Sequence, residues 1–149
     1  MGKAVSKNDA RVAYIANTYQ QARDICWRDL KNLVREIAVN INESRLEIEV
    51  KTQDGGTSLI WLRGWESIET LRGQKFDLII MDEVAMMKNF WENWQEVIRP
   101  TVTDTRGEVL FLSTPKGYNH FYDLYQLEKK DKDYVSFHFT TYDNPIIPI

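Results

Sequence analysis

Two short runs of apolar residues place the strongest constraint on how this chain can fold. One is LIIM within the stretch FDLIIMDE (76–83), and the other is VLFL (109–112) within GEVLFLSTPKG. A strand with one face in water alternates apolar and polar residues, whereas a strand covered on both faces does not. An apolar stripe at helical spacing separates the two runs. Buried strands that alternate with helices predict an α/β fold, with a mainly parallel central sheet flanked by helices.

The rest of the sequence predicts the elements around these two strands. The turn residues Asp54, Gly55 and Gly56 indicate that 45–63 is an antiparallel hairpin inserted into the fold. Pro100 is expected to end the helix that contains Phe90 and Ile98. The other expected elements are a strand at 12–16, a helix at 17–39, a short helix or turn at 66–74, strands at 77–82 and 109–112, a helix around 121–125 and a last strand at 134–142.

Composition narrows the class of protein. Of the 149 residues, 43% are hydrophobic and 28% are charged, which is typical of a globular domain rather than a disordered chain. The 22 acidic and 19 basic residues give a net charge of −3, which offers no general attraction to nucleic acid. The single cysteine, Cys26, excludes an intrachain disulfide framework. No apolar run approaches the roughly 20 residues that span a bilayer, so we expect no membrane partner.

Polar side chains follow both apolar strands at the point where each strand ends. Asp82 and Glu83 follow the first strand, and Ser113 and Thr114 follow the second. In open parallel sheets, ligands bind outside the carboxyl ends of the strands. Two adjacent carboxylates repel each other, and a divalent cation with phosphates would offset that repulsion. Each pair alone is also typical of a cap or turn, so the functional interpretation depends on both pairs sharing one edge.

The stretch FDLIIMDE resembles the Walker B segment in the ATPase domain of phage terminase large subunits, the motors that package DNA into capsids. Four further stretches resemble the same family in the same order: VAYIANTYQQARDICWRDL, SIETLRG, NFWENWQEVIRPTVTDTRG and LFLSTPKGYNHFYDLY. The last is the most specific, because it combines Thr-Pro-Lys-Gly with Asn-His-Phe-Tyr. The resemblance covers residues 11–145, and it implies a P-loop-NTPase-like sheet of the additional-strand, RecA-like type.

The resemblance implies a role for each site residue. Asp82 would coordinate Mg²⁺ through water, and Glu83 would be the general base toward the attacking water. Ser113 and Thr114 would sense the phosphate and couple its loss to movement. Arg72 matches an arginine that is proposed to reach into a neighbouring subunit's ATP site, where such a group is worth about 10³–10⁵ in rate. The implied partners are double-stranded DNA, the portal and the small terminase subunit in the bacterial host cytoplasm, and self-association is left open.

One part of such a site is missing from the sequence. In such ATPases, a G-x-x-x-x-G-K-[ST] loop normally cradles the phosphates of ATP. Neither Gly2-Lys3 nor the turn at 53–58 matches that pattern. We therefore expect a fragment that also lacks the nuclease domain of complete terminases. Residues 1–10 would be a flexible start or a remnant of the upstream helix, residues 11–143 a partial ATPase domain, and residues 144–149 the start of a linker. We expect weak ATP binding and no measurable hydrolysis by this chain alone.

Two other functions are compatible with the same fold. A DEAD-box-like helicase shares the sheet and the acids at the strand end, but it has Asp-Glu-Ala-Asp or Asp-Glu-x-His where this chain has Asp-Glu-Val-Ala (82–85). A non-catalytic interaction module would keep the fold and bind only DNA or partner subunits. Binding of Mg-ATP would separate this module from the two ATP-dependent classes.

Overall fold

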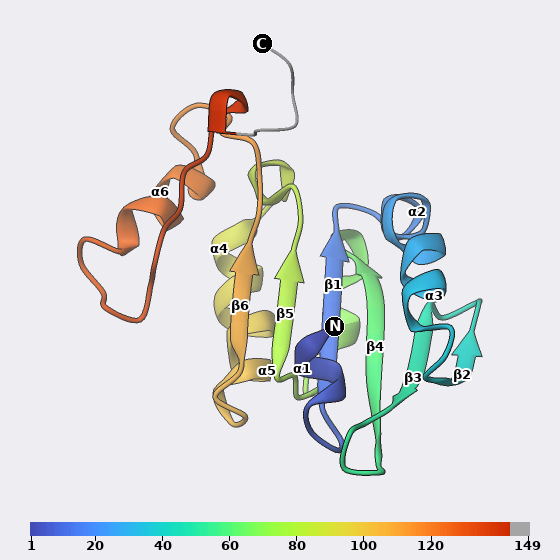
Figure 1. Ribbon diagram of the computed structural model, residues 1–149. Coiled ribbons are helices and arrows are strands. Elements are labelled where there is room, and N and C mark those ends of the chain that lie inside the picture. The colour runs from blue at the N-terminus through green and yellow to red at the C-terminus, as the bar shows by residue number, and fades with distance from the viewer. Residues whose placement is uncertain (144–149) are drawn as a thin grey trace. The chain divides into compact units, whose positions relative to one another are not determined.

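The computed structural model describes residues 1–143, and its centre is a mixed sheet with the strand order β2-β3-β4-β1-β5-β6 (Figure 1). The strands are β1 (Arg11–Ala16), β2 (Ala38–Asn42), β3 (Glu47–Lys51), β4 (Thr57–Gly64), β5 (Leu78–Met81) and β6 (Glu108–Phe111). Strands β4, β1, β5 and β6 are parallel to one another, whereas β3 pairs antiparallel with β4, and β2 pairs antiparallel with β3. The predicted mainly parallel sheet and the hairpin formed by β3 and β4 are both confirmed.

Helices precede, connect and follow these strands. They are α1 (Gly2–Val5), α2 (Tyr19–Ala22), the π-helix η1 (Arg23–Trp27), α3 (Arg28–Val34), the 3₁₀-helices η2 (Trp65–Leu71) and η3 (Val84–Met86), α4 (Phe90–Asn93), the π-helix η4 (Trp94–Ile98), α5 (Arg99–Thr103), α6 (His120–Leu127) and the 3₁₀-helix η5 (Thr141–Asp143). The chain divides into two units, Met1–Thr114 and a second that begins at Pro115. The whole sheet belongs to the first unit.

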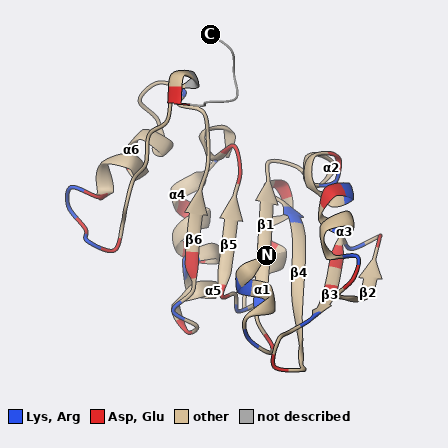
Figure 2. Cartoon of the chain, viewed as in Figure 1, with Lys and Arg blue, Asp and Glu red and all other residues tan. Residues whose placement is uncertain are grey.

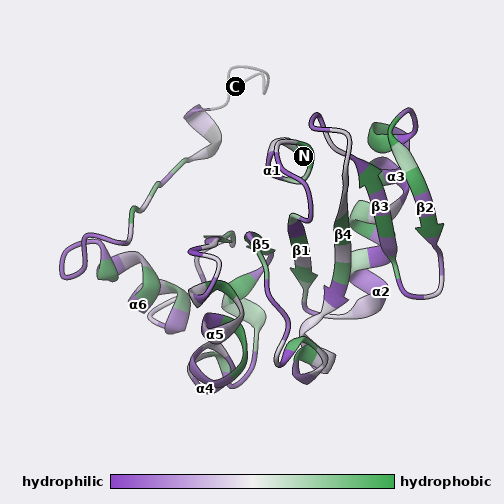
Figure 3. Cartoon of the chain, turned by 90° about the horizontal axis from the view of Figure 1, so that it is seen from below, coloured by the Kyte–Doolittle hydropathy of each residue, from purple (hydrophilic) through white to green (hydrophobic). Residues whose placement is uncertain are grey.

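One face of the sheet is covered by α1 and by the continuous run of α2, η1 and α3. Thr18 begins this run, because its side chain accepts a hydrogen bond from the N–H of Gln21. Ala22 and Trp27 are then buried against strand residues such as Val12. Figure 3 colours β1 and β3 mostly green, for hydrophobic residues. Burial of this apolar surface stabilises the packing by about 25 cal/mol per Å².

The opposite face of β5 and β6 is covered by α4, η4 and α5, which lie behind these strands in Figure 1. Aromatic rings fill this layer. The Trp94 ring lies 5.1 Å from the Phe111 ring of β6 and 6.4 Å from the Phe90 ring, measured between centroids. Ile79 and Met81 of β5 are fully buried there. The stripe predicted at helical spacing therefore forms the core of this layer.

The first face is less covered toward β6. Four residues lie side by side across it, because Tyr14 is in register with Leu62 and Ile80, and Ile80 with Leu110. Leu62 is fully buried, Tyr14 and Ile80 are half-buried, and Leu110 is 51% exposed. Leu112, which follows β6, is 48% exposed. Strand β6 is also the last strand of the described sheet, so its outer edge carries no partner strand there.

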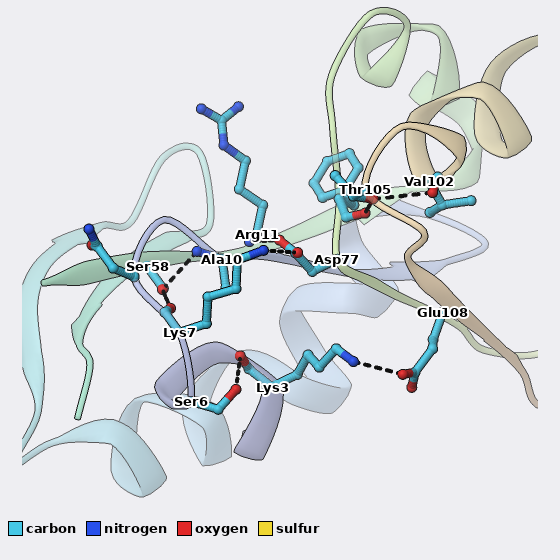
Figure 4. A network of polar contacts seen from close by, with 12 residues as sticks. Lys3, Ser6, Lys7, Ala10, Arg11, Ser58, Asp77, Val102, Thr105 and Glu108 are labelled. Atoms are coloured by element: carbon cyan, nitrogen blue, oxygen red, sulfur yellow. Dashed lines mark hydrogen bonds and ion pairs between the residues drawn. The ribbon is translucent and has the colours of Figure 1, made fainter. Parts of the chain in front are cut away.

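Asp77, the acid that precedes the apolar run of β5, has a structural role. Its carboxylate accepts hydrogen bonds from Lys7 Nζ at 2.8 Å and from the backbone N–H of Arg11 at 3.0 Å (Figure 4). Burial raises the pKa of Asp77, but the bonds from Lys7 and Arg11 together outweigh it and leave the pKa below its ordinary value. A second ion pair, Lys3 with Glu108 at 2.7 Å, joins α1 to β6. These contacts hold the start of the chain against the sheet.

Two sequence predictions about helix ends are wrong. The helix expected at 17–39 ends at Val34, and Ala38–Asn42 instead forms β2, which pairs with β3. Apolar Val39 and Ile41 alternate there with asparagines, and pairing with β3 decides the conformation. Pro100 does not end its helix, because the π-helix η4 leads directly into α5 and its irregular turn, in which the N–H of Arg99 bonds to the carbonyl of Trp94, accommodates the missing N–H of proline.

The prediction of a last strand at 134–142 is also wrong. Residues 134–140 form no helix or strand, and η5 begins at Thr141. Within the described residues this stretch pairs with no strand, and Val135, Phe137 and Phe139 are 69–77% exposed. Apolar alternation makes pairing favourable, but a strand forms only beside a partner. The linker expected at 144–149 lies outside the described residues, and none of the helices at 1–143 is long and apolar enough to cross a bilayer.

Candidate functional site

The two polar pairs predicted from the sequence lie at one edge of the sheet on neighbouring strands. Strands β5 and β6 are parallel, and their last residues, Met81 and Phe111, are in register. The N–H of Leu112 donates to the carbonyl of Met81 at 2.9 Å, and the N–H of Val84 donates to the carbonyl of Leu112 at 3.1 Å. Asp82–Glu83 and Ser113–Thr114 therefore leave the sheet side by side. Figure 2 shows the acidic pair as a red segment at the end of β5.

The side chain of Ser113 contacts the turn after the carboxylates. Its Oγ accepts a hydrogen bond from the N–H of Ala85 at 3.1 Å and donates one to the carbonyl of Thr114 at 3.2 Å. The first bond connects the end of β6 to η3, the helical turn that Glu83 precedes. The two strand ends are therefore joined by a side-chain contact as well as by backbone bonds.

Asp82 is held by hydrogen bonds to both carboxylate oxygens. The hydroxyl of Tyr14 donates to Oδ2 at 2.6 Å, and the N–H of Glu83 donates to Oδ1 at 3.0 Å. The N–H of Asp82 donates to the carbonyl of Ile15 at 2.8 Å, which continues the pairing of β5 with β1. Burial and then the bond to Asp82 raise the pKa of Tyr14 well above its ordinary value, so this hydroxyl keeps its proton. Asp82 is half-buried, with its carboxylate at the surface of the edge.

Glu83 has an unusual backbone conformation. Its φ of 54° and ψ of 43° lie in the left-handed region, which costs a non-glycine residue roughly 1–2 kcal/mol. The side-chain amide of Asn17 donates to the carbonyl of Glu83 at 3.3 Å and supports this turn from the end of β1. The side chain of Glu83 is exposed. Strained backbone of this kind clusters at functional sites, because it presents a side chain that an ordinary turn would not.

The chemistry of this edge suits a hard divalent cation. Asp82 and Glu83 supply carboxylate oxygens, Ser113 and Thr114 supply hydroxyls, and Mg²⁺ binds oxygen ligands while it keeps several waters. Within residues 1–143 neither carboxylate takes part in an ion pair with a lysine or arginine. In the same range no cluster of three or more His, Cys, Asp or Glu could enclose a metal by itself. A cation here would complete its shell with water and ligand oxygens.

Arg72 lies away from these side chains. Gln74, two positions later, accepts a hydrogen bond from Nη1 of Arg11 at 3.4 Å, and Arg11 begins β1 at the opposite edge of the sheet. Arg72 is held by Glu69 through bonds of 2.8 and 2.9 Å, and it donates to the carbonyl of Glu96 at 3.1 Å. The hydrogen bonds that Arg72 donates to the Glu69 carboxylate raise the pKa of Arg72. The structure does not bring this arginine together with the carboxylate pair of its own chain.

Two residues of this edge, Tyr14 and Asn17, were missed by the sequence analysis. Tyr14 belongs to β1 and Asn17 directly follows that strand, and β1 lies beside β5 in the sheet. The sequence showed an apolar strand at 12–16 but not which strand would be its neighbour. The one available signal was that a polar residue, Asn17, directly follows a buried parallel strand, as Asp82 does.

Comparison with known proteins adds sequence evidence. A family model described as "Terminase large subunit, T4likevirus-type, N-terminal" matches residues 2–146. The large subunit of the terminase of Escherichia phage T5 is 29% identical over 140 residues, which cover 92% of this chain and 31% of that protein. The chain thus spans about a third of the length of that relative.

Solved structures are similar as well. The ATPase domain of the large terminase of Thermus phage P74-26 is 28% identical, with a TM-score of 0.67 over 81% of this chain and 54% of that one. The large terminase of another thermophilic bacteriophage, in complex with ATP-γ-S, has a TM-score of 0.72 over 95% of this chain and 34% of that one. At 21% identity, that second similarity concerns the fold alone. The predicted P-loop-NTPase-like fold agrees with both.

Proposed function

Because this chain belongs to the terminase large subunit family and forms part of its ATPase domain, we propose that it supplies the metal- and water-handling half of the ATP site of a DNA-packaging motor. The observation that carries this proposal is the common edge of β5 and β6, where Asp82–Glu83 and Ser113–Thr114 emerge side by side. The comparisons favour this function over a DEAD-box-like helicase and over a non-catalytic module.

The proposed roles follow from the positions of the four side chains. Asp82 holds Mg²⁺ through water, since its carboxylate is fixed at the edge and half-exposed. Glu83 is the general base that orients and deprotonates the attacking water, because its exposed carboxylate has no cation partner among residues 1–143. Ser113 and Thr114 respond to the phosphate. The bond from Ala85 to Ser113 connects that response to the turn beside the base.

Arg72 is proposed to act on the ATP site of a neighbouring subunit rather than on its own. Its contacts with Glu69 and Glu96 rather than with the carboxylate pair, and its half-exposed side chain, support this arrangement. The bidentate contact with Glu69 would have to open before the guanidinium could reach a phosphate. Such a cation would then stabilise the negative charge of the transition state.

ATP binding by this chain is expected to be weak, because the sequence has no glycine-rich loop ending in Gly-Lys-Ser or Gly-Lys-Thr. We expect no hydrolysis above background by the chain alone. In a complete packaging motor, the partners would be double-stranded DNA, the portal and the small terminase subunit, in the cytoplasm of the bacterial host. Contact between subunits would be needed for Arg72 to act.

Titration of the ¹⁵N-labelled chain with Mg-ATP, followed by NMR chemical shifts, tests this function. Wild type should show changes at the ends of β5 and β6 with a Kd of about 1 mM or weaker. Asp82→Asn should remove the metal-dependent part of these changes. Asp104→Asn, which alters an exposed carboxylate paired with Lys75 at 3.0 Å, is the matched control and should bind like wild type. Equal binding by wild type and Asp82→Asn would contradict the proposal.

A further inference from the structure

The hydrogen bond between Tyr14 and Asp82 connects two strands at the candidate metal site. Tyr14 belongs to β1, and its hydroxyl reaches Oδ2 of Asp82, the residue after β5, at 2.6 Å. The other bond to this carboxylate comes from the N–H of Glu83, the next residue in the chain, which contacts Oδ1. Tyr14 therefore provides the side-chain contact that holds the carboxylate from a neighbouring element.

Packing determines where the Tyr14 hydroxyl can lie. Tyr14 is half-buried. It is in register with Leu62 of β4 on one side and with Ile80 of β5 on the other. On its open side, the ring lines an apolar groove together with Cys26 and Leu30 of the helical layer. Neighbours on both adjacent strands limit the alternative rotamers of the ring, so its hydroxyl is a well-placed donor.

A well-placed donor changes what the carboxylate can do. An aspartate at the end of a strand can rotate about its side-chain bonds, and this freedom costs free energy when a metal or its water must be bound in one geometry. Donors on different oxygens, Tyr14 on Oδ2 and Glu83 on Oδ1, define the plane of the carboxylate. Each oxygen keeps acceptor capacity for a metal-bound water.

We propose that Tyr14 is a positioning residue, which orients the Asp82 carboxylate for the hydrated cation. The inference rests on the proposed metal-binding role of Asp82, and it assigns Tyr14 no contact with ATP or with the attacking water. Outer partners of this kind typically change metal affinity about 10–100-fold when they are removed. Since Asp82 acts through water, we expect a change near the lower end, about tenfold.

The first measurement needs no metal. In Tyr14→Phe the ring remains and only the hydroxyl is lost, so the fold should persist. The amide of Glu83 should exchange with solvent faster, because its acceptor, Asp82 Oδ1, is no longer held in place. Tyr19→Phe, which removes a hydroxyl that donates to the carbonyl of Ser44 at 3.0 Å, is the matched control. Unchanged exchange at Glu83 in Tyr14→Phe would overturn the positioning role.

The second measurement uses Mn²⁺ as a paramagnetic substitute for Mg²⁺ and follows broadening of amide signals at Ile15, Asn17 and Glu83. Tyr14→Phe should need about tenfold more Mn²⁺ than wild type or Tyr19→Phe, and Asp82→Asn should abolish the localised broadening. Equal Mn²⁺ dependence in Tyr14→Phe and wild type would overturn the inference and leave the metal site standing. If localised broadening persists in Asp82→Asn or is missing in wild type, the metal-binding role of Asp82 is refuted. The positioning role of Tyr14, which rests on it, is then refuted too.

Discussion

The N–H of Ala85 donates a hydrogen bond to the hydroxyl of Ser113 at 3.1 Å, across the gap between the ends of β5 and β6. This contact joins the turn after the candidate base to the strand whose end carries the candidate phosphate sensor. The two strand ends are also joined by backbone bonds through Leu112. Coupling between phosphate contact and motion can therefore begin at this bond.

Ser113→Ala should lower the free energy of unfolding by about 1 kcal/mol, because the N–H of Ala85 loses an acceptor. The amide signals of Glu83 and Ala85 should shift in the same variant. Urea unfolding and NMR spectra measure the two effects. Ser6→Ala removes an exposed hydroxyl that donates to the carbonyl of Lys3 at 3.1 Å, and this control should leave both quantities near the wild-type values. Unmoved signals in Ser113→Ala would show that the strand ends are not coupled here.

Asp77→Asn should destabilise the protein by about 1–2 kcal/mol at neutral pH, because a buried carboxylate loses its charge-assisted bonds. The folded-state pKa of Asp77 lies below its ordinary value. Its contribution is therefore complete above the unfolded pKa of about 3.9 and is lost as the pH falls through the lower folded value. Urea unfolding of both proteins should show a difference that is constant near neutrality and shrinks in acid. A difference that grows in acid would contradict this assignment.

Glu83→Gly should raise the free energy of unfolding by about 1 kcal/mol, because glycine adopts a φ of 54° without the steric cost that other residues meet. Glu83→Ala removes the same carboxylate but keeps the Cβ, so it should show no such gain. Thermal or urea unfolding compares the two variants. If alanine stabilises as much as glycine, charge repulsion with Asp82 rather than backbone strain is the cause.

Leu62→Ala should destabilise the first unit by about 2–5 kcal/mol, because Leu62 is fully buried in the core and its removal leaves a cavity. Leu33→Ala makes the same chemical change at a side chain that is 66% exposed, and it should change stability by about 0.5 kcal/mol or less. Urea unfolding tests the contrast. A large loss for Leu33→Ala would mean that the exposed side of α3 packs against something in solution.

The sequence was most informative where local pattern and global fold agree. LIIM and VLFL are apolar at every position, which predicted two neighbouring parallel strands, so the common edge of β5 and β6 could be predicted. The expected cover on both faces is found for β5 but not for β6, where Leu110 and Leu112 are about half exposed. Tyr14 could not be assigned to the site, because its partner Asp82 is 68 positions away and the neighbour of β1 depends on strand order. Side-chain contacts between strands depend on the tertiary structure, and the periodicity of the sequence does not predict them.

Two of the errors have a common cause. The expected helix included Ala38 and Val39, yet β3 offers a pairing edge there and Ala38–Asn42 forms β2. Residues 134–140 have the alternation of a strand, yet no strand of the described residues lies beside them in the sheet. In both places, the presence or absence of a partner decides the conformation. A single sequence indicates the conformational preference of a segment but not which elements will pack beside it in the fold.

The outer edge of β6, which is unpaired in the described sheet and lies next to Leu110 and Leu112, has a practical consequence for anyone who handles this protein. Unsatisfied N–H and C=O groups beside apolar side chains are a template for intermolecular β-structure. Concentrated samples should therefore gain fibrillar or amorphous aggregates with time, and a lysine in place of Leu110 should extend their shelf life.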